Sequence, residues 1–154
     1  MRVVVDASVV AASLVRPKGW TAAELRRTDV QWLTPSFLFD ELSDHEVDLA
    51  HWAGCSQEEF RNRVSDLRRV LKTVSAASLV RSADDPLVRR AEEVDADDAA
   101  YFAAFVATKA DYLWTRDRKI LEAFPGIAVR IIPTSAASPT GGETGPRERN
   151  GQDR

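Results

Sequence analysis

The sequence has few of the residues that form disulfides and soft-metal sites. Cys55 is the only cysteine among 154 residues, and only two histidines are present, His45 and His51. A single cysteine excludes a disulfide within the chain and a zinc site built from several cysteines, and it is typical of a reducing compartment. We therefore expect a cytoplasmic protein without a cysteine-based site.

An excess of basic residues and a long apolar run are also absent. The formal net charge is −3, so attraction for nucleic acid must come from local arginine patches or from bound metal. No stretch approaches the roughly 20 apolar residues of a membrane span. Asp6 interrupts the Val-rich start of the chain, and we expect neither a secretory signal nor a membrane partner.

The chain divides into two parts by composition. With 44% hydrophobic residues it is long enough for one domain with a real core. The segment after Ile132 contains no Val, Leu, Ile or aromatic residue and cannot bury enough apolar surface to offset its ordering entropy. We predict one domain over residues 1–132 and a disordered tail over residues 133–154.

Short apolar runs alternate with helical patterns along the domain. The β-branched run Val3-Val4-Val5 is typical of a strand buried on both faces. Further strands are expected at 31–33, 79–80, 112–115 and 129–132, and helices at 35–52, 56–72, 86–94, 97–106 and 118–124. This alternation favours an α/β fold in which helices cover both faces of a parallel sheet.

The first long helix is expected to begin with Thr34 as its N-cap and Pro35 as its first residue. One face of that helix then carries an apolar stripe at helical spacing, made by Leu38, Leu42, His45, Leu49 and Trp52. The sequence from Ser56 to Glu59 indicates a capping box for the next helix. We expect all four tryptophans to pack in or beside the core: Trp20, Trp32, Trp52 and Trp114.

Four acidic residues lie where a parallel sheet gathers ligands, beyond the carboxyl ends of its strands. Asp6 and Asp117 follow predicted strands, and Glu41 and Asp98 lie early in helices that start at the same edge. Two carboxylates about 4 Å apart repel by roughly 4 kcal/mol at an effective dielectric near 20. Such a cluster needs a cation or captured protons, and its oxygen ligands suit Mg²⁺ or Mn²⁺.

Four segments resemble the ordered motifs of the PIN-domain nucleases: Val3–Ser8, Pro35–Leu42, Asp97–Ala103 and Trp114–Asp117. The resemblance implies a Rossmann-like three-layer domain with a central, mainly parallel, five-stranded sheet. It also implies Mg²⁺- or Mn²⁺-dependent endonucleolytic cleavage of RNA, with 5′-phosphate and 3′-hydroxyl products. The family's acidic positions fall on Asp6, Glu41, Asp98 and Asp117, and its supporting hydroxyl residues fall on Ser8 and Thr115.

Several assignments stay open at this level. The third motif offers Asp95, Asp97 and Asp98, and the spacing to Asp117 favours Asp98 without excluding Asp97. Asp6 and Asp117 can also act as helix N-caps, and Glu41 can form a salt bridge with an arginine. Arg116 and Arg118 flank Asp117 and are our preferred phosphate contacts. The basic residues of the second long helix are either ordinary helix surface or an RNA track.

Other functions are also compatible with parts of the pattern. A phosphoryl-accepting receiver and a dehalogenase-type phosphatase fit less well, because Asp6 has no second acid beside it. A non-catalytic PIN-like binding or scaffold module is the main alternative to an enzyme. Among nucleases, the chain resembles either a VapC-type toxin restrained by a small antitoxin protein or a solitary RNA-processing enzyme, and PIN relatives often form homodimers.

Overall fold

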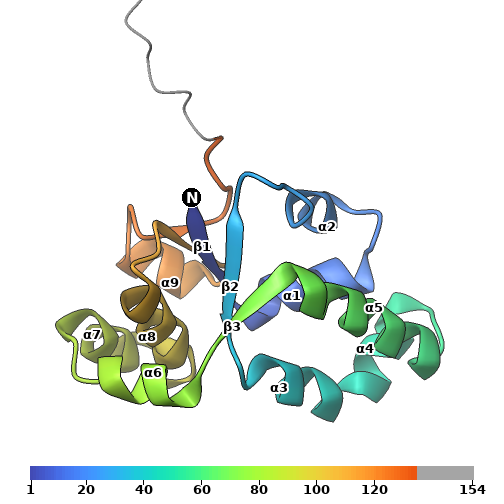
Figure 1. Ribbon diagram of the computed structural model, residues 1–154, viewed down its shortest axis with the longest axis horizontal. Helices are drawn as coiled ribbons and strands as arrows, with labels where there is room; N and C mark the ends of the chain where they lie inside the picture. The colour runs from blue at the N-terminus through green and yellow to red at the C-terminus, as the bar shows by residue number, and fades with distance from the viewer. Residues whose placement is uncertain (135–154) are drawn as a thin grey trace, which may run out of the picture.

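The computed structural model describes residues 1–134, which form an open sheet with helices on both sides (Figure 1). The five strands lie in the order β3-β2-β1-β4-β5, and every neighbouring pair is parallel. They are β1 (Arg2–Val5), β2 (Gln31–Pro35), β3 (Leu71–Val74), β4 (Tyr112–Trp114) and β5 (Ala128–Val129). The predicted α/β architecture with a five-stranded parallel sheet is confirmed.

Two groups of helices cover the two faces of the sheet (Figure 1). One face carries α1 (Ala7–Val15), α2 (Trp20–Glu24), α3 (Leu38–Asp44), α4 (Glu46–Ala53) and α5 (Gln57–Val70). The other carries α6 (Ala76–Ser82), α7 (Pro86–Val94), α8 (Ala99–Thr108) and α9 (Arg118–Ala123). A short 3₁₀ turn, η1 (Ala96–Asp98), leads into α8.

Strand β1 shows why both layers form. Val3 and Val5 pack in the core beside α1 together with Trp114, whereas Val4 packs in the opposite core with Leu113. Successive side chains of a strand point to opposite faces, so a continuous apolar run requires cover on both sides. All three valines of β1 are fully buried, as their sequence predicts.

The first long helix differs from its prediction at its start. Thr34 and Pro35 end strand β2 instead of capping a helix, and α3 begins at Leu38. Pro35 stands opposite Val74 in the sheet, and the N–H of Ser36 donates to the Val74 carbonyl at 3.0 Å. A proline is tolerated here because pairing with β1 ends at Leu33, while pairing with β3 continues through the N–H of Ser36.

The predicted apolar stripe of this helix is interrupted. The helix ends at Asp44, and α4 starts at Glu46 after His45, whose φ of −103° and ψ of 13° are not helical. After the break Leu49 is still buried, but Trp52 is 67% exposed, and its prediction as a packed residue is wrong.

The third strand and the last strand also differ from their predictions. Residues 79–80, predicted as a strand, lie in α6, and the strand is Leu71–Val74, where the end of a helix was expected. Short apolar runs have no periodicity that separates strand from helix, so tertiary pairing decides. The last strand is only Ala128–Val129 rather than 129–132, and Ile131 is exposed.

The remaining sequence predictions concern the ends of the chain and the membrane. The predicted tail of residues 133–154 lies, from residue 135 onward, outside the described residues. Within residues 1–134, every helix is too short or too polar to cross a lipid bilayer.

Candidate active site

Asp6 follows β1 and is held by neighbouring donors. One of its oxygens, Oδ1, accepts the Ser8 hydroxyl at 2.7 Å and the Val9 amide at 3.1 Å, which caps α1. The other, Oδ2, accepts the hydroxyl of Thr115. Burial raises the pKa of Asp6, which is only 5% exposed, and these hydrogen bonds oppose the rise by stabilising the carboxylate.

Thr115 connects the ends of the two central strands. It is fully buried after β4, and its Oγ1 donates to Asp6 and accepts the N–H of Asp117 at 3.0 Å. The Ser8 hydroxyl makes a second link, because it accepts the N–H of Arg116 at 3.4 Å. Ser8 and Thr115 therefore fix Asp6 relative to the turn that carries Asp117.

Three carboxylates come closer together than any others in residues 1–134. One oxygen from each of Asp95, Asp98 and Asp117 lies within 4.8 Å of the other two. Asp95 and Asp98 are joined by the η1 turn, in which the Asp98 N–H donates to the Asp95 carbonyl at 3.1 Å. Three acids at this separation repel one another in water-poor surroundings, so the arrangement favours a bound cation or a proton.

Asp98 is the most strongly perturbed acid of this group. Partial burial raises its pKa to about 7, with further contributions from Asp6, Asp95 and Asp117. A neutral Asp98 can share its proton with Asp117, which also favours the protonated form. In the absence of metal, the raised pKa favours a protonated Asp98 up to about pH 7.

The candidate Glu41 lies outside this close group. It is exposed in the first turn of α3, and partial burial together with Asp97 and Asp44 raises its pKa, while His45 lowers it. Among the described residues, no arginine forms a salt bridge with Glu41. Asp97 is exposed and acts on Glu41, so Asp98, and not Asp97, joins Asp117.

Tyr101 also lies in this region, and the sequence patterns predicted no role for it. Its side chain is 4% exposed and its hydroxyl has no hydrogen-bond partner in the described part of the chain. Burial raises its pKa, as do the charges of Glu41, Asp6 and Asp98. The phenol is thus close enough to Glu41, Asp6 and Asp98 for their charges to act on it, and its only sequence signal is its place three residues after Asp98.

Asp95 is the second residue missing from the site predicted from the sequence, although the third motif offered it beside Asp97 and Asp98. Its Oδ1 accepts the N–H of Asp97 at 3.1 Å and starts the η1 turn. Asp117 similarly caps α9 through the Lys119 amide at 2.9 Å. Capping and a place in the acid group therefore coexist, since each carboxylate has further lone pairs to offer.

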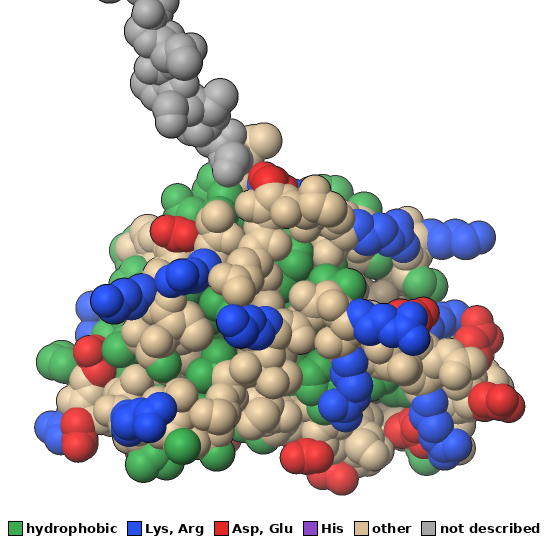
Figure 2. Space-filling model, in the orientation of Figure 1, with side chains coloured by type: hydrophobic (Ala, Val, Ile, Leu, Met, Phe, Trp, Pro, Cys, Tyr) green, Lys and Arg blue, Asp and Glu red, His purple; other side chains and the backbone are tan. Residues whose placement is uncertain are grey.

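Most arginines of the second long helix are already engaged. On α5, Arg61 pairs with Glu46 at 2.7 Å and Arg63 with Glu59 at 3.1 Å, while Arg68 lies over the Phe39 ring. On the face shown in Figure 2, basic side chains are scattered among acidic ones and form no continuous patch. These contacts favour ordinary helix surface over an RNA track.

The two arginines beside Asp117 differ from each other. Arg118 pairs with Glu122 at 2.9 Å along α9, although both side chains are mostly exposed. Arg116 makes no ion pair with an acid of residues 1–134. Of the two phosphate contacts predicted from the sequence, Arg116 is the one whose guanidinium is not already bound to a carboxylate.

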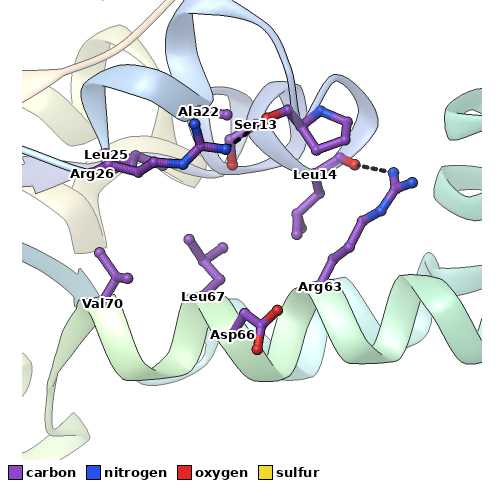
Figure 3. A pocket seen from close by; sticks show the side chains of 10 residues that line it. Ser13, Leu14, Ala22, Leu25, Arg26, Arg63, Asp66, Leu67 and Val70 are labelled. Atoms are coloured by element: carbon purple, nitrogen blue, oxygen red, sulfur yellow. Dashed lines mark hydrogen bonds between the residues drawn. The ribbon is translucent and has the colours of Figure 1, made fainter.

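The molecule also has a pocket between α1, α2 and α5, away from the acidic edge of the sheet (Figure 3). Leu14, Leu67 and Val70 make it mainly apolar, and the Arg63 guanidinium donates to the Leu14 carbonyl at 3.0 Å. It lacks the gathered carboxylates of the sheet edge, so it is not our candidate active site.

Comparison with known proteins agrees with this description. The sequence profile of the PIN domain matches residues 4–134. The fold is similar to a chain in the crystal structure of VapBC2 from Rickettsia felis bound to a DNA fragment from their promoter. That similarity has a TM-score of 0.61 and 13% identity, and it covers 83% of this chain and 96% of that chain. No curated protein sequence matches significantly. Because the profile spans most of the sequence, the chain belongs to the PIN-domain family of nucleases.

Proposed function

We propose that this protein is a divalent-metal-dependent endoribonuclease that acts at the acidic edge of its sheet. The observation that carries the proposal is the group formed by Asp95, Asp98 and Asp117, in which one oxygen of each carboxylate lies within 4.8 Å of the other two. Carboxylates arranged in this way are unfavourable without a counter-charge and are characteristic of functional sites.

The donor set fits Mg²⁺ or Mn²⁺. The three closest groups, Asp95, Asp98 and Asp117, offer only carboxylate oxygens, and neither histidine nor cysteine is among them. Hard oxygen ligands suit these two ions better than zinc or copper. When bound, the metal supplies Lewis-acid chemistry, which neutralises charge on the scissile phosphate and lowers the pKa of water.

The side chains of the site then have separate tasks. Asp95, Asp98 and Asp117 hold the metal, and Asp6 adds a carboxylate whose orientation Ser8 and Thr115 fix. A ligand that is fixed before the substrate arrives loses little free energy to reorganisation.

Glu41 lies outside the group of three carboxylates, and its raised pKa makes it a better proton acceptor than an ordinary glutamate. We assign it the role of orienting the attacking water and accepting its proton at the carboxylate. The charges of Glu41, Asp6 and Asp98 all act on the Tyr101 hydroxyl.

RNA as substrate is supported by the resemblance of the four motifs, with cleavage to 5′-phosphate and 3′-hydroxyl ends. The solved VapBC2 structure supports a further proposal, that a small antitoxin protein binds this chain and restrains it. A homodimer and a cytoplasmic location belong to the same proposal. At 13% identity these are analogies, and a solitary RNA-processing nuclease has the same site chemistry.

The direct test is cleavage of a labelled mixed-sequence single-stranded RNA, and of DNA of the same sequence, in Mn²⁺, Mg²⁺ or EDTA. Asp98→Asn keeps the shape of the side chain and removes its charge. Asp84→Asn is the matched control, because Asp84 is 92% exposed and its only ion pair within residues 1–134 is with Arg89. We expect metal-dependent RNA cleavage that falls by at least about 100-fold in Asp98→Asn and is unchanged in Asp84→Asn.

Each other outcome has a definite meaning. Equal cleavage by wild type and Asp98→Asn would assign the activity to a contaminant and remove the support for this site. Preferential cleavage of DNA would replace the substrate class. Absence of cleavage, together with no metal binding, would favour the non-catalytic PIN-like module.

A further inference from the structure

A second cavity lies beside β5, at the opposite edge of the sheet from β3. Its volume is about 510 Å³, within the range of roughly 300–1,000 Å³ typical of ligand pockets. Its wall is formed by the end of α1, the start of α2 and the segments after β4 and β5, including Arg16, Trp20, Arg116 and Arg130. Among residues 1–134, no aspartate or glutamate lines it.

The three arginines of this cavity are not committed to acids. Arg16, Arg116 and Arg130 form no ion pair within residues 1–134. The pocket of Figure 3 differs, since Arg63 there donates to Leu14 and to Glu59, and Arg26 donates to the Pro17 carbonyl at 3.0 Å. Three like charges around one cavity repel one another unless an anion enters.

The cavity also offers an aromatic face. Trp20 is 52% exposed, and its ring stands edge-on to the buried Trp114 ring, with centroids 5.9 Å apart and an interplanar angle of 86°. The Trp114 indole in turn donates to the Arg130 carbonyl at 3.0 Å. Trp114 therefore contacts both Trp20 and the segment of Arg130, and about half of the Trp20 surface is accessible to a flat ligand.

Arg116 links the cavity to the candidate active site along the chain. Arg116 stands between Thr115 and Asp117, and its N–H donates to Ser8, which also bonds Asp6. A cation-attracting group and an anion-attracting cavity thus share one short segment. A nucleic acid strand carries both features that the cavity matches, phosphate charge and a planar base.

We infer that the cavity lined by Arg16, Arg116, Arg130 and Trp20 binds one nucleotide of a single-stranded RNA substrate, next to the phosphodiester held at the acid group. The guanidinium groups contact phosphate oxygens, and a base stacks on Trp20. This inference rests on the proposed function, because it extends the same substrate from the acid group to a second site.

The experiment measures binding of a fluorescently labelled single-stranded RNA 12-mer by anisotropy, with full-length protein in EDTA, so that cleavage does not interfere. We expect Arg16→Ala and Arg130→Ala each to raise Kd by about threefold to tenfold at 0.1 M salt. The slope of log K against log salt should fall by about 0.7 for each lost phosphate contact. Arg69→Ala removes the same charge from an exposed site outside the cavity and should change Kd by less than about twofold.

Trp20 is tested separately, because its loss also removes a contact to Trp114. Trp20→Ala should raise Kd by at least about fivefold, and Trp20→Phe, which keeps an aromatic face, should recover most of that loss. Circular dichroism of both variants shows whether the fold is retained. Equal Kd for Trp20→Ala and Trp20→Phe, with both folded, would contradict the stacking role.

The inference fails if the wild type does not bind the RNA, or if Arg16→Ala and Arg130→Ala behave like Arg69→Ala. An acidic protein segment would then be the better candidate ligand. The result is separate from the nuclease proposal. RNA binding through this cavity without any cleavage supports the inference alone. Cleavage by a protein whose RNA binding these variants do not change supports the nuclease proposal alone.

Discussion

The candidate active site has two halves, which differ in whether hydrogen-bond donors compensate the charge of their carboxylates. In the anchored half, Asp6 is satisfied by hydroxyl and amide donors from Ser8, Val9 and Thr115. In the crowded half, defined by Asp95, Asp98 and Asp117, acidic oxygens face one another within 4.8 Å. The first arrangement stabilises a charge within the fold, and the second leaves a charge that the fold alone does not compensate.

This difference indicates a structural role for the anchored half and a metal-binding role for the crowded half. The anchored half should contribute to stability whether or not metal is present, because its hydrogen bonds lie within the protein. The crowded half should lower the free energy of unfolding without metal, and a bound cation should raise it again. Two substitutions, one in each half, can distinguish these behaviours.

The largest stability effect is expected in the anchored half. Thr115→Val keeps the shape of a fully buried side chain but removes the donor to Asp6 and the acceptor for the Asp117 N–H. We expect the free energy of unfolding to fall by about 2–3 kcal/mol, because a buried carboxylate oxygen is left without its partner. Urea denaturation in EDTA at pH 7 measures it.

The matched control is Thr73→Val, the same substitution at an exposed position of edge strand β3. We expect it to change the free energy of unfolding by less than about 0.5 kcal/mol. If Thr115→Val and Thr73→Val have equal effects, Thr115 does not anchor Asp6.

A smaller effect is expected in the crowded half, where an ionised carboxylate lowers the free energy of unfolding instead of raising it. The pKa of Asp98 is about 7 in the folded protein and near its ordinary value of 3.8 in the unfolded chain. Between these values the folded state binds more protons, so stability falls as pH rises. Allowing for solvent screening, metal-free wild type should lose about 1–2 kcal/mol between pH 5 and pH 8 relative to Asp98→Asn.

Urea denaturation of both proteins in EDTA at the two pH values measures this difference. Asp84→Asn, which is exposed and outside the acid group, should follow the wild type. A pH dependence that is the same in wild type and Asp98→Asn would show that Asp98 does not carry the shifted proton.

The sequence was sufficient to predict the edge at which the acids gather. Parallel strands end at one edge, so Asp6 after β1 and Asp117 after β4 had to approach each other, and helical starts brought Asp98 to the same place. The three consecutive valines of β1 likewise required two covered faces. These predictions depend on local patterns that tertiary structure rarely overrides.

Other features depend on contacts that no local pattern contains. Trp52 is exposed after the break at His45, and pairing with β2 made a strand of Leu71–Val74, where the helical pattern predicted a helix. The η1 turn placed Asp95 beside Asp98 and left Asp97 near Glu41. The arginine cavity joins residues 12–21 to the distant segments after β4 and β5, and which arginines lack acidic partners is known only after folding.

The central claim is that the crowded half binds a divalent cation through Asp98. Calorimetric titration of Mn²⁺ at pH 6, in two buffers of different ionisation enthalpy, measures affinity and proton release together. We expect wild type to bind and release about one proton, because Asp98 is protonated there before the metal enters. Asp98→Asn should bind at least about tenfold more weakly and release fewer protons. Wild type that does not bind Mn²⁺, or Asp98→Asn that binds with the same affinity and proton release, would contradict the account.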